Sequence, residues 1–350
     1  MPVLSIILLA VSIAIVLFAA ELFTNGVEWL GHKLKLGEGA VGSILAAVGT
    51  ALPETLLPIV AIVGAALSGN PADKCTSHEI GIGAILGAPF MLSTAAFLVT
   101  GLSVFIFSAA RRRTTDMVVN PVILERDMRF FLIVYALAVG ASFLPSPPLK
   151  YAVAAALVGL YAYYVKRTLD EPTEDQGETD LERLRFHHDV DDPHLSRVWA
   201  QIIVALLLIV VGAQVFVQNM AAVATALGVP ALVLSLILAP LATELPEKFN
   251  SVVWISRGKD TLALGNITGA MVFQSCIPVA VGLTLTPWMI DTPGLVSAVI
   301  ALAAGTAVWA YLRLTRDLTP HILVACGTLY VAFLLYVVSG AAAATTTPHC

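Results

Sequence analysis

Long apolar runs recur along nearly the whole sequence and limit the folds that are open to it. A helix crosses the roughly 30 Å of hydrocarbon in a bilayer with about 20 apolar residues. We find ten such runs, at about 3–30, 38–68, 78–106, 128–144, 149–166, 198–226, 229–256, 260–286, 293–311 and 320–340. Barrel strands would instead alternate polar and apolar residues over about ten positions. With 58% hydrophobic and 12% charged residues, the chain is predicted to be an all-α polytopic membrane protein.

Basic residues are distributed unevenly over the loops between these spans. If successive loops alternate between the two sides of the membrane, one side holds only Lys74 and Lys150 and the other holds 16 basic residues. Those are Lys33, Lys35, Arg111, Arg112, Arg113, Arg126, Arg129, Lys166, Arg167, Arg183, Arg185, Arg197, Arg257, Lys259, Arg313 and Arg316. Lys and Arg accumulate in short cytoplasmic loops. We therefore predict a multi-pass protein of the cytoplasmic (inner) membrane with both termini outside.

The sequence aligns with itself at a fixed offset. A threonine, a proline and a glutamate recur in both halves, at Thr50 and Thr243, Pro53 and Pro246, and Glu54 and Glu247. Each half holds five predicted spans, an odd number, so the second half enters the membrane from the opposite side. Inverted repeats place equivalent residues near the membrane midplane. We predict two inverted five-helix repeats, residues 1–166 and 198–350, whose two glutamates converge.

Residues 167–197 join the two halves. Ten acidic residues lie between positions 170 and 192, a composition typical of a solvated cytoplasmic linker. The alternative is a weak accessory metal site through His187, His188, Asp191 or His194. The segment is too short to form a separate regulatory domain.

The paired glutamates are the strongest functional signal. A carboxylate at mid-membrane costs about 2.5–3.5 kcal/mol and usually marks an ion or proton pathway. The proline before each glutamate frees carbonyls of the preceding turn, which need a partner in lipid, and a cation is one. Proline also suits the first position of a new helix. We therefore expect the second and seventh helices to be broken, with Glu54 and Glu247 each in the first turn of a half-helix, near its positive dipole end.

The residues around the glutamates favour an all-oxygen cation site. Carboxylates, threonine hydroxyls, backbone carbonyls and the Asn266 amide suit Ca²⁺, whereas zinc or copper would require His or Cys. For Thr50 and Thr243, a hydrogen bond to their own helix is an equal alternative to ligation. Gln274 lines the pathway or satisfies a neighbouring backbone. No cofactor beyond the transported ions and no nucleic-acid partner is expected, and the oligomeric state is left open.

Two other groups of residues have simpler structural interpretations. We interpret the glycines of the repeated segments as sites of close helix packing; they are Gly83, Gly87, Gly265 and Gly269. Cys276 and Cys326 are small core residues. Cys75 and Cys350 both fall on the predicted outer side, where pairing is a minor alternative. No enzyme motif is found, because His78 and Glu79 do not extend to H-E-x-x-H.

The paired segments resemble the α-repeats of the sodium/calcium exchanger family, within the wider cation/calcium antiporter superfamily. Residues 47–54 (AVGTALPE) and 240–247 (PLATELPE) are similar to the G-T-S-x-P-E pattern, and residues 264–271 (LGNITGAM) match half of G-N-x-x-G-S-N. The resemblance implies a Ca²⁺ site at Glu54 and Glu247, aided by Thr50 and Thr243, with flanking Na⁺ sites. It also implies alternating access, with the first and sixth helices sliding past the rest.

The chain departs from that pattern where Na⁺ would bind. The small hydroxyl expected after each threonine is replaced by Ala51 in one repeat and by Glu244 in the other. Glu244 either serves as a third carboxylate, which favours exchange against protons, or pairs with Lys248 at i, i+4. The predicted function is exchange of Ca²⁺ for Na⁺. The alternatives are a Ca²⁺/H⁺ antiporter and a passive divalent-cation channel.

Overall fold

All regular structure in the described part of the chain is helical. The computed structural model describes residues 2–34, 54–64, 71–170, 182–187, 190 and 192–339, without the side chains of 71–73, 169, 242 and 245–250. Its helices are α1 (Pro2–Lys33), Glu54–Gly64, α3 (Pro71–Met91), the π-helix η1 (Leu92–Ala96), α4 (Phe97–Ala109), α5 (Pro121–Gly140), the 3₁₀-helix η2 (Ala141–Phe143), α6 (Pro147–Leu169), α7 (Leu195–Leu227), α8 (Ala231–Ser256), α9 (Asp260–Leu285), α10 (Thr292–Thr315) and α11 (Pro320–Val338). The all-α class is confirmed.

Helix lengths agree with passage through a membrane. Within the described residues, seven helices are long and apolar enough to cross one by length and composition, and α3, η1 and α4 together form one of them. Every one of the ten predicted spans contains described helical residues.

The start of α5 differs from the prediction. The helix begins at Pro121, not at 128, because the Asn120 side chain accepts hydrogen bonds from the backbone N–H groups of Val122 and Ile123 and proline suits the first helical position. Arg126 and Asp127 consequently lie inside the helix. They are buried there as an ion pair with an N–O distance of 2.9 Å.

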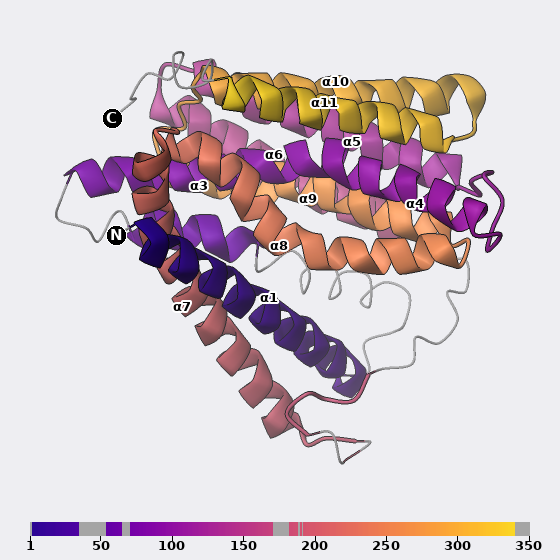
Figure 1. Ribbon diagram of the computed structural model, residues 1–350, viewed down its shortest axis with the longest axis horizontal. Coiled ribbons are helices and arrows are strands. Elements are labelled where there is room, and N and C mark those ends of the chain that lie inside the picture. The colour runs from indigo at the N-terminus through magenta and orange to yellow at the C-terminus, as the bar shows by residue number, and fades with distance from the viewer. Residues whose placement is uncertain are drawn as a thin grey trace.

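The predicted break in the seventh helix is wrong. α8 is helical without interruption from Ala231 to Ser256, so Glu247 lies in its interior and not in the first turn of a new helix. Figure 1 shows α8 changing direction along its length. Pro240 and Pro246 each remove one backbone hydrogen bond and crowd the preceding turn, which bends a helix without ending it. The corresponding break before Glu54 lies outside the described residues.

Close contact between α3 and α8 explains two of the repeated glycines. A Cβ atom at Gly83 would lie 2.3 Å from the carbonyl oxygen of Leu232, and one at Gly87 would lie 2.2 Å from that of Leu236. Only glycine allows this approach, so the close-packing prediction is confirmed for both. It is wrong for Gly265 and Gly269, because a Cβ atom would meet no described atom within 4 Å at Gly265 and only the Tyr164 hydroxyl, at 3.6 Å, at Gly269. Because both contacts advance by one turn in the same direction, α3 and α8 run parallel.

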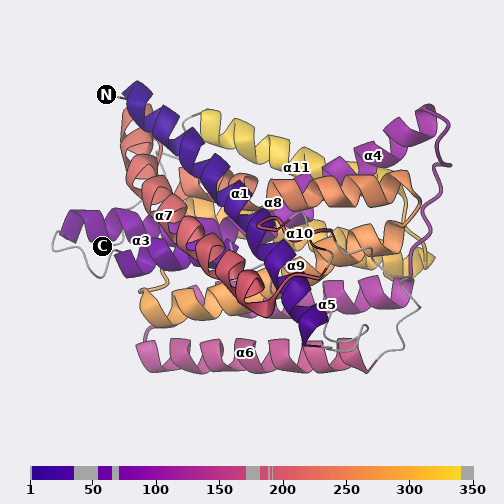
Figure 2. The same cartoon turned by 90° about the horizontal axis from the view of Figure 1, so that it is seen from below.

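The long helices α1 and α7 form a second pair. A Cβ atom at Gly26 would lie 2.8 Å from Ile202, and one at Gly212 would lie 2.8 Å from Val16. As the residue number rises along α1, it falls along α7 at the contacts, so α1 and α7 are antiparallel. Figure 1 shows the pair side by side, leaving the remaining helices at an oblique angle, and Figure 2 shows it crossing them diagonally.

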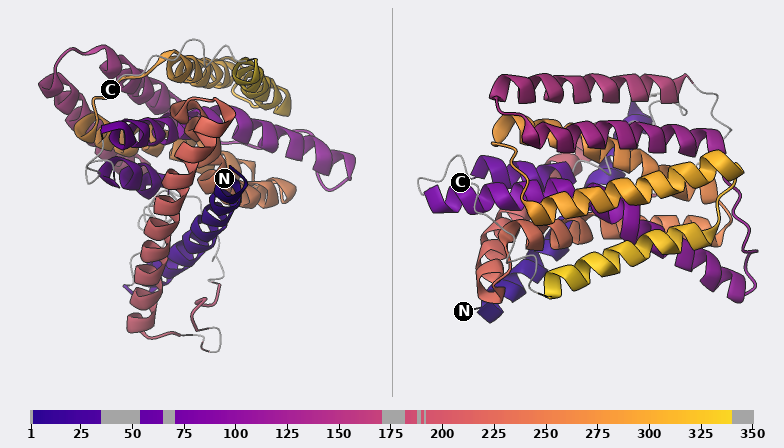
Figure 3. Two further views of the ribbon diagram at one scale, coloured as in Figure 1. Left: turned by 60° about the vertical axis from the view of Figure 1, so that its left-hand side comes forward. Right: turned by 90° about the horizontal axis from the view of Figure 1, so that it is seen from above.

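The other helices pack in a pattern that recurs between the two halves. α5 packs on α9, and α10 packs on α3; α6 packs on α9, and α11 packs on α4. α5 and α10 also contact each other. In the right panel of Figure 3, α6 and α11 occupy opposite edges with α5 and α10 between them.

A buried ion pair fastens one end of this bundle. The Arg113 guanidinium donates to both carboxylate oxygens of Asp260, at 2.5 and 2.8 Å, and to the backbone oxygen of Ile255. The Val118 N–H also donates to Asp260. Both side chains of the pair are almost fully buried, so the loop after α4 is held against the start of α9.

The cysteines follow the prediction in part. Cys276 and Cys326 are buried and free, as expected of small core residues. Cys75 is disulfide-bonded, whereas the sequence favoured an unpaired thiol. Cys350 lies outside the described residues.

Candidate functional site

A glutamine brings two buried carboxylates together in the middle of the helix bundle. The Nε2 atom of Gln274 donates to Glu54 and to Glu244, in the second case at 3.4 Å. Glu54 is 6% exposed, Glu244 0% and Gln274 1%. The three residues come from three helices far apart in sequence: Glu54–Gly64, α8 and α9.

The local sequence explains how each group reaches this place. Glu54 is the first described residue of the apolar helix Glu54–Gly64, which packs Leu57 and Ala61 into the core. Glu244 follows the run LVLSLILAPLA, whose buried face contacts α3. Gln274 lies in the apolar stretch MVFQSC of α9. An amide in such a stretch needs a partner because burying it unpaired is costly.

Glu244 is fully buried and contacts Gln274 on another helix, as expected of a third carboxylate in the site. The side chain of Lys248 lies outside the described residues. Glu244 and Glu54 therefore share one amide donor.

The electrostatics of the pair favour a cation. Both carboxylate oxygens lie within 3.4 Å of the same nitrogen, so they are at most about 7 Å apart. Two unit charges about 7 Å apart repel each other by about 2.4 kcal/mol at an effective dielectric constant of about 20. A cation or a proton placed between the two oxygens would remove it.

The other predicted ligands are placed differently. The Thr243 hydroxyl donates to the carbonyl of Ala239, four residues earlier in α8, at 3.2 Å, which is the helix-bonding alternative. Asn266 is half-buried on α9 and precedes Gln274 by two turns, or about 12 Å of helix rise. The structure thus does not bring Asn266 into contact with the Gln274 amide.

Two predicted residues cannot be assigned a place in the site. Thr50 lies outside the described residues, and so does the side chain of Glu247, although its backbone is part of α8. Among the described side chains, no three His, Cys, Asp or Glu residues form a group able to hold a metal. The described carboxylates of the site number two, Glu54 and Glu244.

A second buried polar cluster holds α9 in position. Asp127 on α5 accepts hydrogen bonds from Thr268 on α9 at 2.8 Å and from Tyr164 on α6 at 3.0 Å. Arg126 also donates to it at 2.9 Å. With its charge paired and its oxygens satisfied, this carboxylate ties three helices together. The cluster therefore fixes the helix that carries Gln274.

The sequence left two roles open for Gln274, lining the pathway or satisfying a neighbouring backbone, and did not connect it with Glu54. Its signal was an amide inside an apolar run, a short distance after the segment 264–270 that repeats residues 81–87 of the first half. The contact itself needed the tertiary structure, because Gln274 is separated from Glu54 by 220 residues.

Comparison with known proteins places the chain in a family. The pattern of the family described as "Sodium/calcium exchanger protein" matches residues 4–168 and 197–339. The chain is 24% identical over 291 residues to a putative antiporter, CaxA, of Alkalimonas amylolytica, covering 80% of this chain and 81% of that one. It is 23% identical over 288 residues to the inner membrane protein YrbG of Escherichia coli (strain K12), covering 81% of each.

Solved structures share the fold. The crystal structure of an H⁺/Ca²⁺ exchanger, CAX, aligns with a TM-score of 0.74 at 14% identity, covering 97% of this chain and 87% of that one. The sodium-calcium exchanger NCX_Mj aligns with a TM-score of 0.57 at 17% identity, covering 96% and 99%. The family pattern covers most of the sequence, and the fold agrees with it. The chain belongs to the sodium/calcium exchanger protein family.

Proposed function

We propose that the protein is a secondary active antiporter that moves Ca²⁺ against protons across the cytoplasmic membrane. The observation that carries the proposal is the pair of buried carboxylates, Glu54 and Glu244, which share the Gln274 amide. Oxygen ligands of this kind suit Ca²⁺. We include Glu247 in the same site, as the repeat predicts, with backbone carbonyls of the bent helix α8.

The directions of the helices support an inverted repeat. If both halves entered the membrane from the same side, the first helices of the two halves, α1 and α7, would be parallel; they are antiparallel. Likewise α3 and α8 would be antiparallel, and they are parallel. Ten alternating spans with inversion after the fifth account for both. Such a repeat relates two half-sites that alternate in access.

The choice of proton over sodium rests on the ligands. Exchange against Na⁺, which the resemblance implies, is the second candidate and is favoured by family membership. The Thr243 hydroxyl, however, bonds to its own helix, and Glu244 occupies the position where a small hydroxyl would help to hold Na⁺. Two carboxylates about one amide can hold a proton without further ligands. The likeness in fold to both kinds of exchanger does not favour either ion.

The proposed orientation has both termini outside. The uneven distribution of basic residues supports it. The disulfide of Cys75 at the start of α3 supports it as well, because disulfides persist outside the reducing cytoplasm and this helix start is on the predicted outer side.

Flux measurements with swapped gradients test the proposal. We would measure Ca²⁺ uptake into vesicles that contain the purified protein, first with an imposed pH gradient and then with an imposed Na⁺ gradient. The pH gradient is expected to drive uptake. Glu54→Gln and Glu247→Gln are expected to abolish it, because each removes a proposed Ca²⁺ ligand.

The controls separate the candidates. Uptake driven by Na⁺ alone would replace the proton by sodium and leave the Ca²⁺ site intact. Flux that ignores both gradients would indicate a channel. If neither gradient moves Ca²⁺, or if both variants still transport, the proposed function is wrong.

A further inference from the structure

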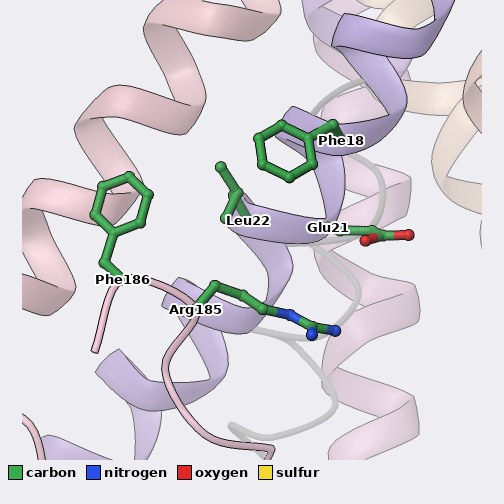
Figure 4. Close-up of a pocket in the computed structure, with 5 residues that line it drawn as sticks. All are labelled: Phe18, Glu21, Leu22, Arg185 and Phe186. Carbon is green, nitrogen blue, oxygen red and sulfur yellow. The ribbon is translucent and has the colours of Figure 1, made fainter. Parts of the chain in front are cut away.

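A recess opens on the surface of α1 beside residues 182–187 of the segment that joins the two halves. Its volume is 230 Å³, and it is lined by Phe18, Glu21 and Leu22 of α1 together with Arg185 and Phe186, as Figure 4 shows. Three of these side chains are apolar, and the other two carry opposite charges. None of them belongs to the carboxylate site, so the recess calls for an explanation of its own.

Hydrogen bonds fix the backbone on one side of the recess. The Arg185 N–H donates to the Asn25 side chain of α1 at 3.1 Å, and the Phe186 N–H donates to the Gln201 side chain of α7 at 2.9 Å. Leu184, just before them, is fully buried. The side chains of Arg185 and Phe186 therefore stay at the recess although both are exposed. Groups held in place beforehand lose less freedom when a ligand binds.

The two charged side chains of the recess are available to a ligand. Within the described part of the chain, no ion pair joins Glu21 to Arg185. Arg185 bonds instead to Glu182 at 2.9 Å, and both partners of that pair are well exposed. Exposed pairs contribute little to stability, so Arg185 can exchange Glu182 for another anion. Figure 4 shows the charged ends of Glu21 and Arg185 extending to the same side, away from the Phe186 ring.

The recess lies where a lipid headgroup would meet α1. Residues 3–20 carry no charged side chain, and 18 residues of helix rise about 27 Å, close to the roughly 30 Å of the hydrocarbon. Glu21 follows this run directly. Within it, Ile7, Val11 and Phe18 are exposed and lie on one face of the helix, and that face leads to the recess. An acyl chain lying along this face would place its headgroup at Glu21.

The charges of the recess select one class of headgroup. A guanidinium presents a planar set of N–H donors that fits a phosphate, and a carboxylate forms charge-assisted hydrogen bonds with an ammonium group. Glu21 and Arg185 together therefore match a headgroup that carries both an ammonium and a phosphate. A headgroup that carries only negative charge would be attracted by Arg185 and repelled by Glu21.

We propose that the recess binds an aminophospholipid of the phosphatidylethanolamine class. Its ammonium group lies at Glu21, its phosphate at Arg185, and the first part of an acyl chain on the apolar side chains of the recess, which are Phe18, Leu22 and Phe186. The bound lipid links α1 to residues 182–187 from the membrane side. The inference does not depend on the antiport cycle, because it uses none of the carboxylates of the proposed Ca²⁺ site.

Thermal unfolding of the full-length protein in a neutral detergent tests the binding. We would titrate phosphatidylethanolamine, phosphatidylcholine, phosphatidylglycerol and free phosphoethanolamine in turn, because a ligand that binds only the folded state raises the unfolding midpoint. Phosphatidylethanolamine should act at the lowest concentration. Phosphatidylcholine has no N–H on its cation and phosphatidylglycerol has no cation, so each should need about fivefold more. Free phosphoethanolamine, which has no acyl chain, should have little effect.

Two variants remove the charges one at a time. Glu21→Gln should raise the phosphatidylethanolamine concentration for half the shift about fivefold and lower that for phosphatidylglycerol, because the repulsion of its phosphate is gone. Arg185→Gln should weaken all three phospholipids, because each carries a phosphate. The matched controls are Glu28→Gln, an exposed acid on the same face of α1, and Arg197→Gln, an exposed arginine of α7. Both should keep the wild-type order of lipids.

Native mass spectrometry gives a second readout, because a bound phosphatidylethanolamine should remain on the wild-type protein and be lost from Glu21→Gln and Arg185→Gln. The proposal is overturned if the three phospholipids act equally, or if Glu28→Gln changes the order of lipids as Glu21→Gln does. An equal effect of free phosphoethanolamine would make the recess a site for a soluble ligand and overturn the lipid assignment. Absence of both a midpoint shift and a retained lipid would also overturn it.

Discussion

Replacement of Glu244 by glutamine is the sharpest test of the proton-coupling proposal. The substitution removes one negative charge and keeps the size and an oxygen that can accept from Gln274. Because the two carboxylate oxygens are at most about 7 Å apart, the repulsion between the two charges is at least about 2.4 kcal/mol at an effective dielectric constant of about 20. That energy corresponds to about a fiftyfold change in an equilibrium constant. The proposed coupling proton would remove this repulsion by neutralising one of the two carboxylates.

The assay is Ca²⁺ uptake driven by a pH gradient, repeated at several pH values around neutrality. In the wild type, acidification should raise the Ca²⁺ concentration needed for half-maximal uptake, because protons and Ca²⁺ compete for the same oxygens. In Glu244→Gln that dependence should disappear, and proton-driven uptake should fall by about fiftyfold.

Glu125→Gln is the matched control. Its carboxylate is also largely buried, but it is paired with Arg313 and Arg316 and does not contact Gln274. It should keep the wild-type pH dependence. A Glu244→Gln protein that transports with the wild-type pH dependence would refute the reasoning, because the second carboxylate would then have no part in proton binding.

Two further predictions concern stability. Gly87→Ala should lower the free energy of unfolding by about 1–3 kcal/mol, because its Cβ would meet the Leu236 carbonyl at 2.2 Å. Gly265→Ala, with no described atom within 4 Å of the added Cβ, should be tolerated. Thermal unfolding in detergent measures both variants, and equal midpoints would contradict the close-packing argument. Asp260→Asn should lower the free energy of unfolding by about 3–5 kcal/mol, because it leaves the buried charge of Arg113 uncompensated. A double variant with Arg113→Met should recover part of that stability. Additive losses in the double variant would argue against a direct ion pair.

The membrane-spanning character, the helical class and the position of nearly every helix follow from the order of apolar and polar residues along the chain. The reason is that lipid requires backbone hydrogen bonds to be satisfied within each segment, so about 20 apolar residues in a row leave little choice of structure. The repeated glutamate at positions 54 and 247 also needed no coordinates, because a carboxylate in an apolar run stands out locally. Local capping explains why α5 begins seven residues before its predicted span, where Asn120 and Pro121 start the helix ahead of its charged residues.

Which polar groups meet depends on how the helices pack. Gln274 and Glu54 are 220 residues apart, and nothing in the spacing of either segment specifies that they touch. α8 also continues as a helix past Pro240 and Pro246, which the two prolines by themselves do not specify.

The segment 182–187 is attached to α1 and α7 by contacts that composition does not signal, although four of its six residues are exposed. Its contacts with Asn25 and Gln201 use backbone N–H and C=O groups, which every sequence carries, so side-chain composition cannot signal them. The local order of apolar and polar residues thus determines whether a segment forms a membrane-spanning helix. The meeting of distant segments, which joins Glu54 with Glu244 and α1 with α7, is set by packing across the whole bundle.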